Sequence, residues 1–207
     1  NYFGGTVNVT GNRVHITGNS NVVTATTANI SGVGTTITSN AGTVYITGTT
    51  STITTNAAGG KVYITGDAAY LMSSYGTAYV TGNTTVISNA DGGKVFVTGA
   101  SSTVSVNDGN IYITGYSSTI TTNSSNVHIT GNNSTVTTNQ GTVNVTGHSV
   151  TVSLNSGTTN VTGYTSTITN SGTVNITGYS STITSSSGPI NITGYTSTVN
   201  ESSGPVS

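Results

Sequence analysis

The sequence predicts an all-β protein: a single flattened β-solenoid (β-helix) made of two sheets, with no helices. Three observations predict this fold. A short phrase recurs about every 16 residues, its polarity alternates as in a β-strand, and β-branched residues fill it. A period this short is typical of stacked coils, each too small to fold alone.

The repeated phrase is a branched aliphatic residue, any residue, a second branched aliphatic, Thr or Ser, and usually Gly. Residues 44–48 (VYITG) are a clean copy. The spacing is 16 residues with slips of one or two, and the closing glycines are Gly32, Gly48, Gly66, Gly82, Gly99, Gly115, Gly131, Gly147, Gly163, Gly178 and Gly194. About 12 coils stacked at ~4.8 Å would make a rod of roughly 60 Å.

The phrase itself predicts the first strand of each coil. Successive side chains of a strand point to opposite faces, so Val44 and Ile46 are expected inside, with Tyr45 and Thr47 outside.

A second strand is expected after the glycine, in residues 49–56. Continued alternation places Ser51, Ile53 and Thr55 inside. Asn56 and the Gly pair at 59–60 are then expected at the second corner, because a positive φ is cheapest for Gly and Asn.

The repeat never breaks, so residues 1–207 are predicted to form one β-solenoid domain. Residues 1–31 are expected to be irregular first coils and residues 32–207 regular 16-residue coils. Residues 67–75 are off the pattern, with Tyr70, Leu71 and Met72 where Thr and Ile are expected.

Composition argues against several classes of partner. Only 3% of the residues are charged and the net charge is −1, whereas an average soluble protein has roughly 25% charged residues. Without a basic stripe, nucleic-acid binding is not expected. No apolar run approaches the roughly 20 residues of a membrane span, so membrane insertion is not expected either.

The sequence also predicts no catalytic residue, no metal site, no cofactor and no enzyme activity. Acid–base catalysis needs titratable groups held close together. Here such groups lie on different predicted coils, no His/Asp cluster has ligand spacing, and there is no cysteine. The groups are Asp67, Asp91, Asp108, Glu201, His15, His128 and His148.

The second strand exposes a column of Thr-x-Thr pairs, which we call the Thr-x-Thr face. Its members are Thr36, Thr38, Thr52, Thr54, Thr119, Thr121, Thr135, Thr137, Thr167, Thr169, Thr182 and Thr184. This face resembles that of the hyperactive insect ice-binding proteins, flat β-solenoids that order water on ranks of Thr-x-Thr. The coils here are longer and lack the disulfides of the beetle proteins. The alternative is that exposed Thr is simply a good strand former.

The outward position of the first strand carries a second column. The first five members are aromatic, and we call them the aromatic column: Tyr45, Tyr63, Tyr79, Phe96 and Tyr112. His128 and then Asn144, Asn160, Asn175 and Asn191 occupy the same position in the later coils. Stacking within an in-register sheet is one explanation, and lateral packing between rods is the other. A further tyrosine set at one corner, Tyr116, Tyr164, Tyr179 and Tyr195, follows the closing glycines.

Sequons for N-glycosylation are abundant, and several fall within the repeated phrase. Candidate acceptors include Asn8, Asn83, Asn144, Asn160, Asn175 and Asn191. Repetition alone can also produce such triplets.

The predicted ends carry little that would cap a solenoid. Candidate assembly residues are Val7, Val9 and Arg13 at one end and Ile190, Ile192, Glu201 and Val206 at the other. Arg13 is the only Arg and Glu201 the only Glu, and the two would pair across a head-to-tail joint. Open solenoid edges favour a heterologous contact that does not close and builds a fibre.

We therefore expect a non-enzymatic, extracellular structural protein that assembles with itself, end to end and laterally, into filaments or a sheath-like surface layer. Secretion is in keeping with a first residue, Asn1, that is not Met. One alternative is an ice-binding protein that uses the Thr-x-Thr face. A second is a segment of a repetitive adhesin or phage fibre, and glycans are a further candidate partner.

Overall fold

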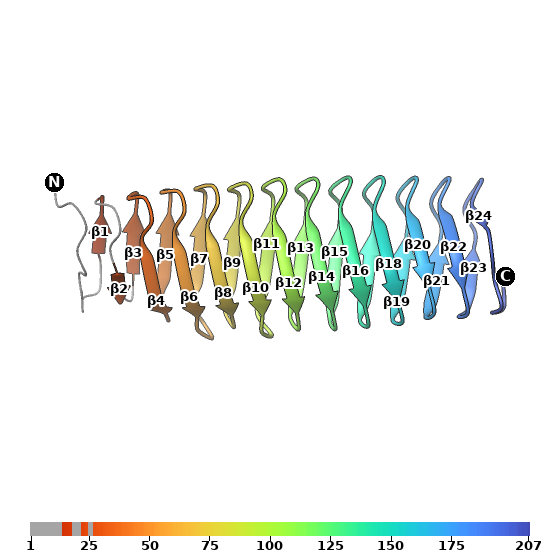
Figure 1. The fold of residues 1–207 in the computed structure, drawn as a ribbon, viewed down its shortest axis with the longest axis horizontal. Helices are drawn as coiled ribbons and strands as arrows, with labels where there is room; N and C mark the ends of the chain where they lie inside the picture. The colour runs from red at the N-terminus through yellow and green to blue at the C-terminus, as the bar shows by residue number, and fades with distance from the viewer. Residues whose placement is uncertain (1–13, 18–21, 25–26) are drawn as a thin grey trace.

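The structure, a computed structural model, describes residues 14–17, 22–24 and 27–207. In this part of the chain two parallel sheets of twelve strands face each other along a rod (Figure 1). The predicted two-sheet β-solenoid is thereby confirmed. Of the residues singled out from the sequence, Val7, Asn8, Val9 and Arg13 lie outside the described residues.

The strands alternate between the two sheets along the chain. One sheet, here the odd sheet, contains β1 (Val14–Ile16), β3 (Thr27–Ile30), β5 (Thr43–Ile46), β7 (Lys61–Ile64), β9 (Thr77–Val80), β11 (Lys94–Val97), β13 (Asn110–Ile113), β15 (Asn126–Ile129), β17 (Thr142–Val145), β19 (Thr158–Val161), β21 (Thr173–Ile176) and β23 (Ile190–Ile192). The other, the even sheet, contains β2 (Val22–Thr24), β4 (Thr36–Asn40), β6 (Thr52–Asn56), β8 (Tyr70–Ser74), β10 (Val86–Ala90), β12 (Thr103–Asn107), β14 (Thr119–Asn123), β16 (Thr135–Asn139), β18 (Thr151–Asn155), β20 (Thr167–Asn170), β22 (Thr182–Ser186) and β24 (Thr198–Val199).

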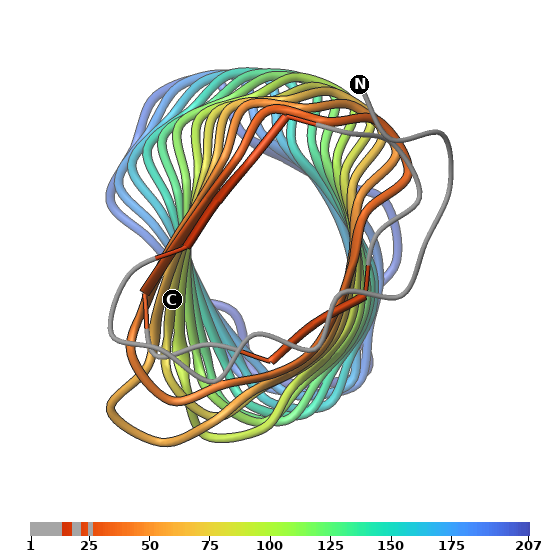
Figure 2. The ribbon, with the colours of Figure 1, turned by 90° about the vertical axis from the view of Figure 1, so that its left-hand side faces the viewer.

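Each strand pairs with the equivalent strands of the coils before and after it. Val44, for example, is opposite Ala28 in β3 and Val62 in β7. Viewed along the axis, each coil is an oval with one sheet on either side, and successive coils are turned relative to one another (Figure 2). This turning is the ordinary twist of β-sheets, so the outer faces of the rod are twisted rather than planar.

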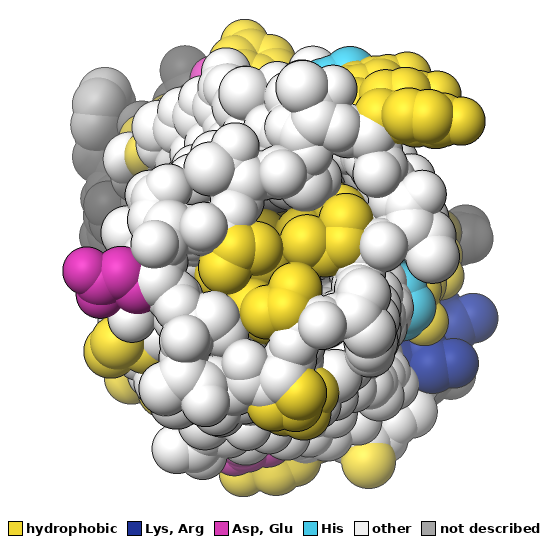
Figure 3. Space-filling view, turned by 90° about the vertical axis from the view of Figure 1, so that its right-hand side faces the viewer, with side chains coloured by type: hydrophobic (Ala, Val, Ile, Leu, Met, Phe, Trp, Pro, Cys, Tyr) yellow, Lys and Arg dark blue, Asp and Glu magenta, His cyan; other side chains and the backbone are white. Residues whose placement is uncertain are grey.

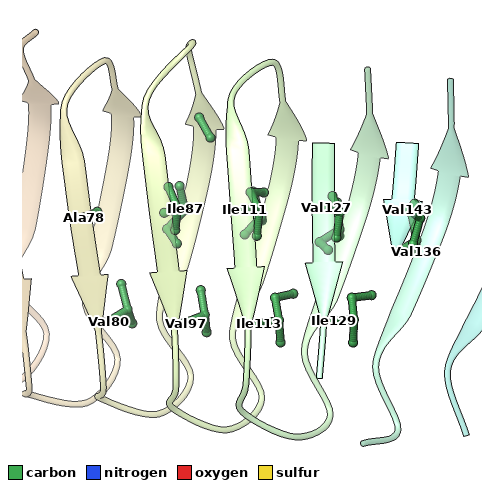
Figure 4. Packing of buried hydrophobic residues seen from close by; sticks show 14 of the residues in the cluster. Ala78, Val80, Ile87, Val97, Ile111, Ile113, Val127, Ile129, Val136 and Val143 are labelled. Carbon is green, nitrogen blue, oxygen red and sulfur yellow. The ribbon is translucent and has the colours of Figure 1, made fainter. Parts of the chain in front are cut away.

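The space between the sheets is filled by three aliphatic side chains from a typical coil. In the coil of β5 and β6 these are Val44, Ile46 and Ile53, all fully buried. Figure 4 shows the same columns further along, where side chains of consecutive strands point into the interior and stack on one another. Burying each such side chain stabilises the fold by roughly 1.5–3 kcal/mol.

The Thr and Gly that close the repeated phrase make contacts with the preceding coil. The backbone amides of Thr47 and Gly48 both donate to the carbonyl oxygen of Ile30, and the Thr47 hydroxyl donates to the same oxygen at 3.3 Å. A Cβ on Gly48 would overlap the carbonyl oxygen of Gly32 directly below it. The Thr and Gly of the phrase are therefore explained by contact between coils. The glycine is needed because a side chain would collide with the backbone of the preceding coil, and not because it has an unusual φ.

Positive φ occurs two residues after this glycine, at a position that is not glycine in ten coils. Its occupants have φ between 53° and 58°: Thr50, Ala68, Thr84, Ser101, Ser117, Asn133, Ser149, Thr165, Ser180 and Thr196. At the second corner Gly59 and Gly92 have positive φ, as expected for that corner, but Asn56 does not belong to it.

The second strand departs from strict alternation. Thr54 and Thr55 are both half-exposed, and Asn56 is buried. The prediction that Thr55 points inward and Asn56 forms the corner was therefore wrong. Leu154 confirms the geometry, because it occupies the position equivalent to Thr55 in β18 and is 60% exposed.

Candidate functional surfaces

The aromatic column of the odd sheet is a continuous stack of rings. Centroids of consecutive rings from Tyr45 to His128 lie 4.8–5.0 Å apart, with interplanar angles of 6–12°. Parallel, in-register pairing places each ring directly above the previous one. Since the faces of consecutive rings are stacked on one another, the column presents ring edges to solvent along its length.

Hydrogen-bonded amides continue this column beyond His128. Asn160 donates from Nδ2 to Oδ1 of Asn144, Asn175 donates to Asn160, and Asn191 donates to Asn175, all at 2.7–2.8 Å. The Nδ2 of Asn144 in turn contacts Nδ1 of His128 at 3.5 Å. All four candidate glycan acceptors in this column therefore use Nδ2 within the column. Asn83 lies at a corner instead, exposed, and its Oδ1 accepts a hydrogen bond from the amide of Ala100.

The corner tyrosines form a second stack over the last coils. The rings of His148, Tyr164, Tyr179 and Tyr195 lie 4.5–5.6 Å apart. Tyr116 lies at the same corner and is 62% exposed. In the view onto the C-terminal end, an apolar group protrudes at one corner of the rod (Figure 3). Tyr195 is 69% exposed, whereas Tyr45 in the aromatic column is 44% exposed.

The Thr-x-Thr face lies on the outer side of the even sheet. Its first threonines are in register over seven consecutive strands, in the order Thr103, Thr119, Thr135, Thr151, Thr167, Thr182 and Thr198. The rank is interrupted on the N-terminal side, where β8 exposes Tyr70 and Met72 and β10 places Val86 and Ser88 at these positions.

A buried asparagine column was missed by the sequence reasoning. It contains Asn40, Asn56, Asn107, Asn123, Asn139 and Asn155, with Ser74, Ala90 and Ser186 at equivalent positions. Each amide donates to the next coil, as in Asn107 to Asn123 at 2.6 Å and Asn123 to Asn139 at 2.7 Å. The available signal was the 16-residue spacing of an Asn just before the second corner.

The coil formed by β23 and β24 exposes the core at its outer edge. Ile192 and Val199 pack on the core but are only partly buried, and Val206 is 53% exposed. Figure 3 shows apolar side chains in the centre of this end, surrounded by a ring of polar and backbone atoms. Val206 pairs with Ile190, and the amide of Ile192 donates to Ser207. Glu201 is exposed nearby; its expected partner, Arg13, lies outside the described residues.

The titratable groups are scattered along the rod. Within residues 14–17, 22–24 and 27–207, no three His, Asp or Glu side chains are grouped so that they could hold a metal ion. The negative charge of Asp91 raises the pKa of the Tyr75 phenol, and a hydrogen bond to that carboxylate acts in the same direction. Asp108 accepts a hydrogen bond from Ser124. No helix in the described part of the chain could span a membrane.

Comparisons with known proteins give no relative from which to transfer a function. No protein-family model matches the chain, and neither the curated proteins nor the solved structures include a match.

Proposed function

We propose that this chain is a non-enzymatic, extracellular structural protein whose solenoids join end to end into filaments or a sheath-like layer. The observation that carries the proposal is the C-terminal edge of the rod, formed by β24 and by residues 205–207, which pair with β23. At this edge Ile192, Val199 and Val206 are left partly or largely exposed. An unpaired strand edge with apolar side chains behind it is a template for another strand.

A second copy of the chain is the occupant that we propose for this edge. The first described strands, β1 and β2, belong to the same two sheets as β23 and β24, and all strands are parallel. A copy stacked on the edge would therefore present strands of the same polarity. Such a contact is heterologous and does not close, so its repetition gives a filament.

Two further features support a structural role. Only 3% of the residues are charged, so little electrostatic repulsion opposes the close approach of copies. The aromatic column also places a line of ring edges on the outer side of the odd sheet. We propose that this line contributes to lateral contact between rods.

A pair of neighbouring substitutions on β24 tests end-to-end assembly. Val199→Lys puts a charge on the core side of the edge, whereas Thr198→Lys puts the same charge on the exposed outer side. We expect sedimentation velocity to show polymers for the natural sequence and for T198K, but single rods for V199K. Near-UV circular dichroism of the distant tyrosine stack checks that both variants fold.

Polymers of unchanged length with V199K would contradict the proposal. A second outcome is that further coils of a longer polypeptide cover the edge. The natural polypeptide would then have a larger intact mass than this chain, and the chain would be a segment of a longer fibre or adhesin. Mass spectrometry of the native protein distinguishes that outcome from assembly of separate copies.

Ice binding is the second candidate, and the seven-strand threonine rank favours it. The twist of the sheets opposes it, because a twisted face departs from a flat lattice (Figure 2). If the candidate is right, Thr121→Tyr or Thr137→Tyr abolishes thermal hysteresis without unfolding the rod. The absence of hysteresis in the natural protein at high concentration would reject it.

A further inference from the structure

A column of buried hydroxyl groups follows the corner on the inner side of the even sheet. In nine coils a Ser or Thr contributes its oxygen, and none of these oxygens has a hydrogen-bond partner in the protein. They belong to Thr35, Ser51, Thr85, Ser102, Ser118, Ser134, Ser166, Ser181 and Ser197. Buried polar atoms in folded proteins are almost always hydrogen-bonded, to protein or to ordered water.

The spacing of the coils does not allow these hydroxyls to bond directly to one another. Equivalent atoms of neighbouring coils lie near 4.8 Å apart, as the stacked rings show. A direct hydrogen bond between hydroxyls needs about 2.8 Å. One water placed between two hydroxyls, with two bonds of about 2.8 Å, spans 4.8 Å at an angle of about 118°, which is close to the preferred geometry.

The column also has room for an additional atom beside each serine. Its members include Val150, which carries two γ-carbons and is fully buried. Thr35 and Thr85 likewise carry two γ-atoms and are fully buried. A serine at the same position has a single γ-oxygen, so it leaves space of about one heavy atom next to it.

Hydroxyl chemistry suits a chain of such bridges. Each hydroxyl has one donor and two acceptor sites, so it can serve the water above and the water below. A buried water needs two to four polar partners, and two consecutive hydroxyls supply the minimum. Ala69 and Val150 lack a hydroxyl and divide the column into separate segments, 35–51, 85–134 and 166–197.

We propose that this column binds a file of buried water molecules, one between each pair of consecutive hydroxyls. The site is independent of the assembly proposed above, because it lies inside each rod. The segment from Thr85 to Ser134 holds the longest uninterrupted file. Val150 separates it from the file that begins at Ser166.

Oxygen-17 magnetic relaxation dispersion of the water signal tests the proposal, because its amplitude reports long-lived buried waters. Ser118→Val introduces valine, the residue that the column already contains at position 150. The change removes the hydroxyl that two bridging waters share. Val150→Ser adds the missing hydroxyl between Ser134 and Ser166. Ser153→Val makes the same chemical change as S118V at a half-exposed, outward position.

We expect the amplitude to fall by two waters per molecule in S118V, to rise by two in V150S and to stay unchanged in S153V. Circular dichroism of the tyrosine stacks confirms that each variant is folded. Equal amplitudes in all four proteins would overturn the proposal and show that the hydroxyls bond elsewhere. Since none of these positions lies on the coil edge, the result does not depend on end-to-end assembly.

Discussion

The most demanding residue position in each coil is the corner residue with positive φ. Non-glycine residues seldom adopt this conformation, and β-branched residues do so at the greatest cost, whereas Asn tolerates it. Thr165 has a φ of 55° and Asn133 has the same φ in another coil. Both donate their backbone amide to a carbonyl of the following coil, so the two positions are directly comparable.

We predict that Thr165→Asn raises the free energy of unfolding by about 1 kcal/mol, because it relieves strain at a β-branched residue. Asn133→Thr, the reverse change at an equivalent corner, should lower it by a similar amount. Urea denaturation followed by circular dichroism measures both shifts. A destabilised T165N would show that the Thr side chain makes a compensating contact at this corner.

At the scale of the element, the buried asparagine column fixes the end of the second strand. Asn123 accepts from Asn107 and from the amide of Ser125, and it donates to Asn139 and to the carbonyl of Ser125. Removal of this amide leaves buried partners without a hydrogen bond, at a cost of about 1–3 kcal/mol for each buried group.

We predict that Asn123→Ala lowers the free energy of unfolding by about 3 kcal/mol. Asn123→Ser should cost less, because Ser74 already accepts a hydrogen bond from Asn56 at an equivalent position. The difference in urea midpoint between the two variants provides the measurement. If N123A and N123S are equally stable, the amide ladder does not contribute to stability.

The break in alternation within the second strand gives a further prediction. Leu154 is 60% exposed, whereas its near neighbour Val152 is buried. Leu154→Thr should change the free energy of unfolding by no more than about 0.5 kcal/mol, as is usual for exposed positions. Val152→Thr should cost about 1–3 kcal/mol, because it buries a hydroxyl. Comparable losses from both changes would mean that Leu154 also packs in the core.

These elements show which parts of the fold can be read from the sequence. In the first strand, Val44 and Ile46 alternate with Tyr45 and Thr47, so the hydrophobic pattern alone gives the correct faces. In the second strand, Thr54 and Thr55 are the same residue type, so hydrophobicity does not distinguish the inner from the outer face. Strict alternation therefore placed Thr55 on the wrong face. Asn56 was predicted at the corner because an isolated Asn favours turns, whereas it is the buried last residue of β6.

The buried polar columns could not be inferred from hydrophobicity, because polar side chains are ordinarily expected on the surface. Asn123 is stable inside only because Asn107 and Asn139 lie directly below and above it in register. These partners come from the neighbouring coils, so the sequence of a single coil does not indicate that its Asn is buried. The first threonine of each Thr-x-Thr pair and the aromatic column could be placed from the sequence, because each depends only on alternation and period. The second threonine is out of register at β20, where the register shifts and Thr169 pairs with Ser185 instead of Thr184.

At the scale of the whole molecule, the rod is a one-dimensional stack in which each coil contacts its neighbours. Inner coils are covered on both sides, whereas the coil of β23 and β24 leaves apolar side chains partly exposed (Figure 3). In a repeat protein of this kind the interface between coils supplies much of the stability. Covering the edge with a second copy would therefore stabilise the last coils as well as lengthen the rod.

Negative-stain electron microscopy of the purified protein in plain buffer tests end-to-end assembly most directly. End-to-end assembly predicts unbranched filaments one rod wide, with an axial repeat near the ~60 Å expected for about 12 coils spaced at ~4.8 Å. It also predicts that V199K gives only short rods under the same conditions. Dispersed short rods of the natural sequence, at concentrations where the protein is folded, would contradict end-to-end assembly.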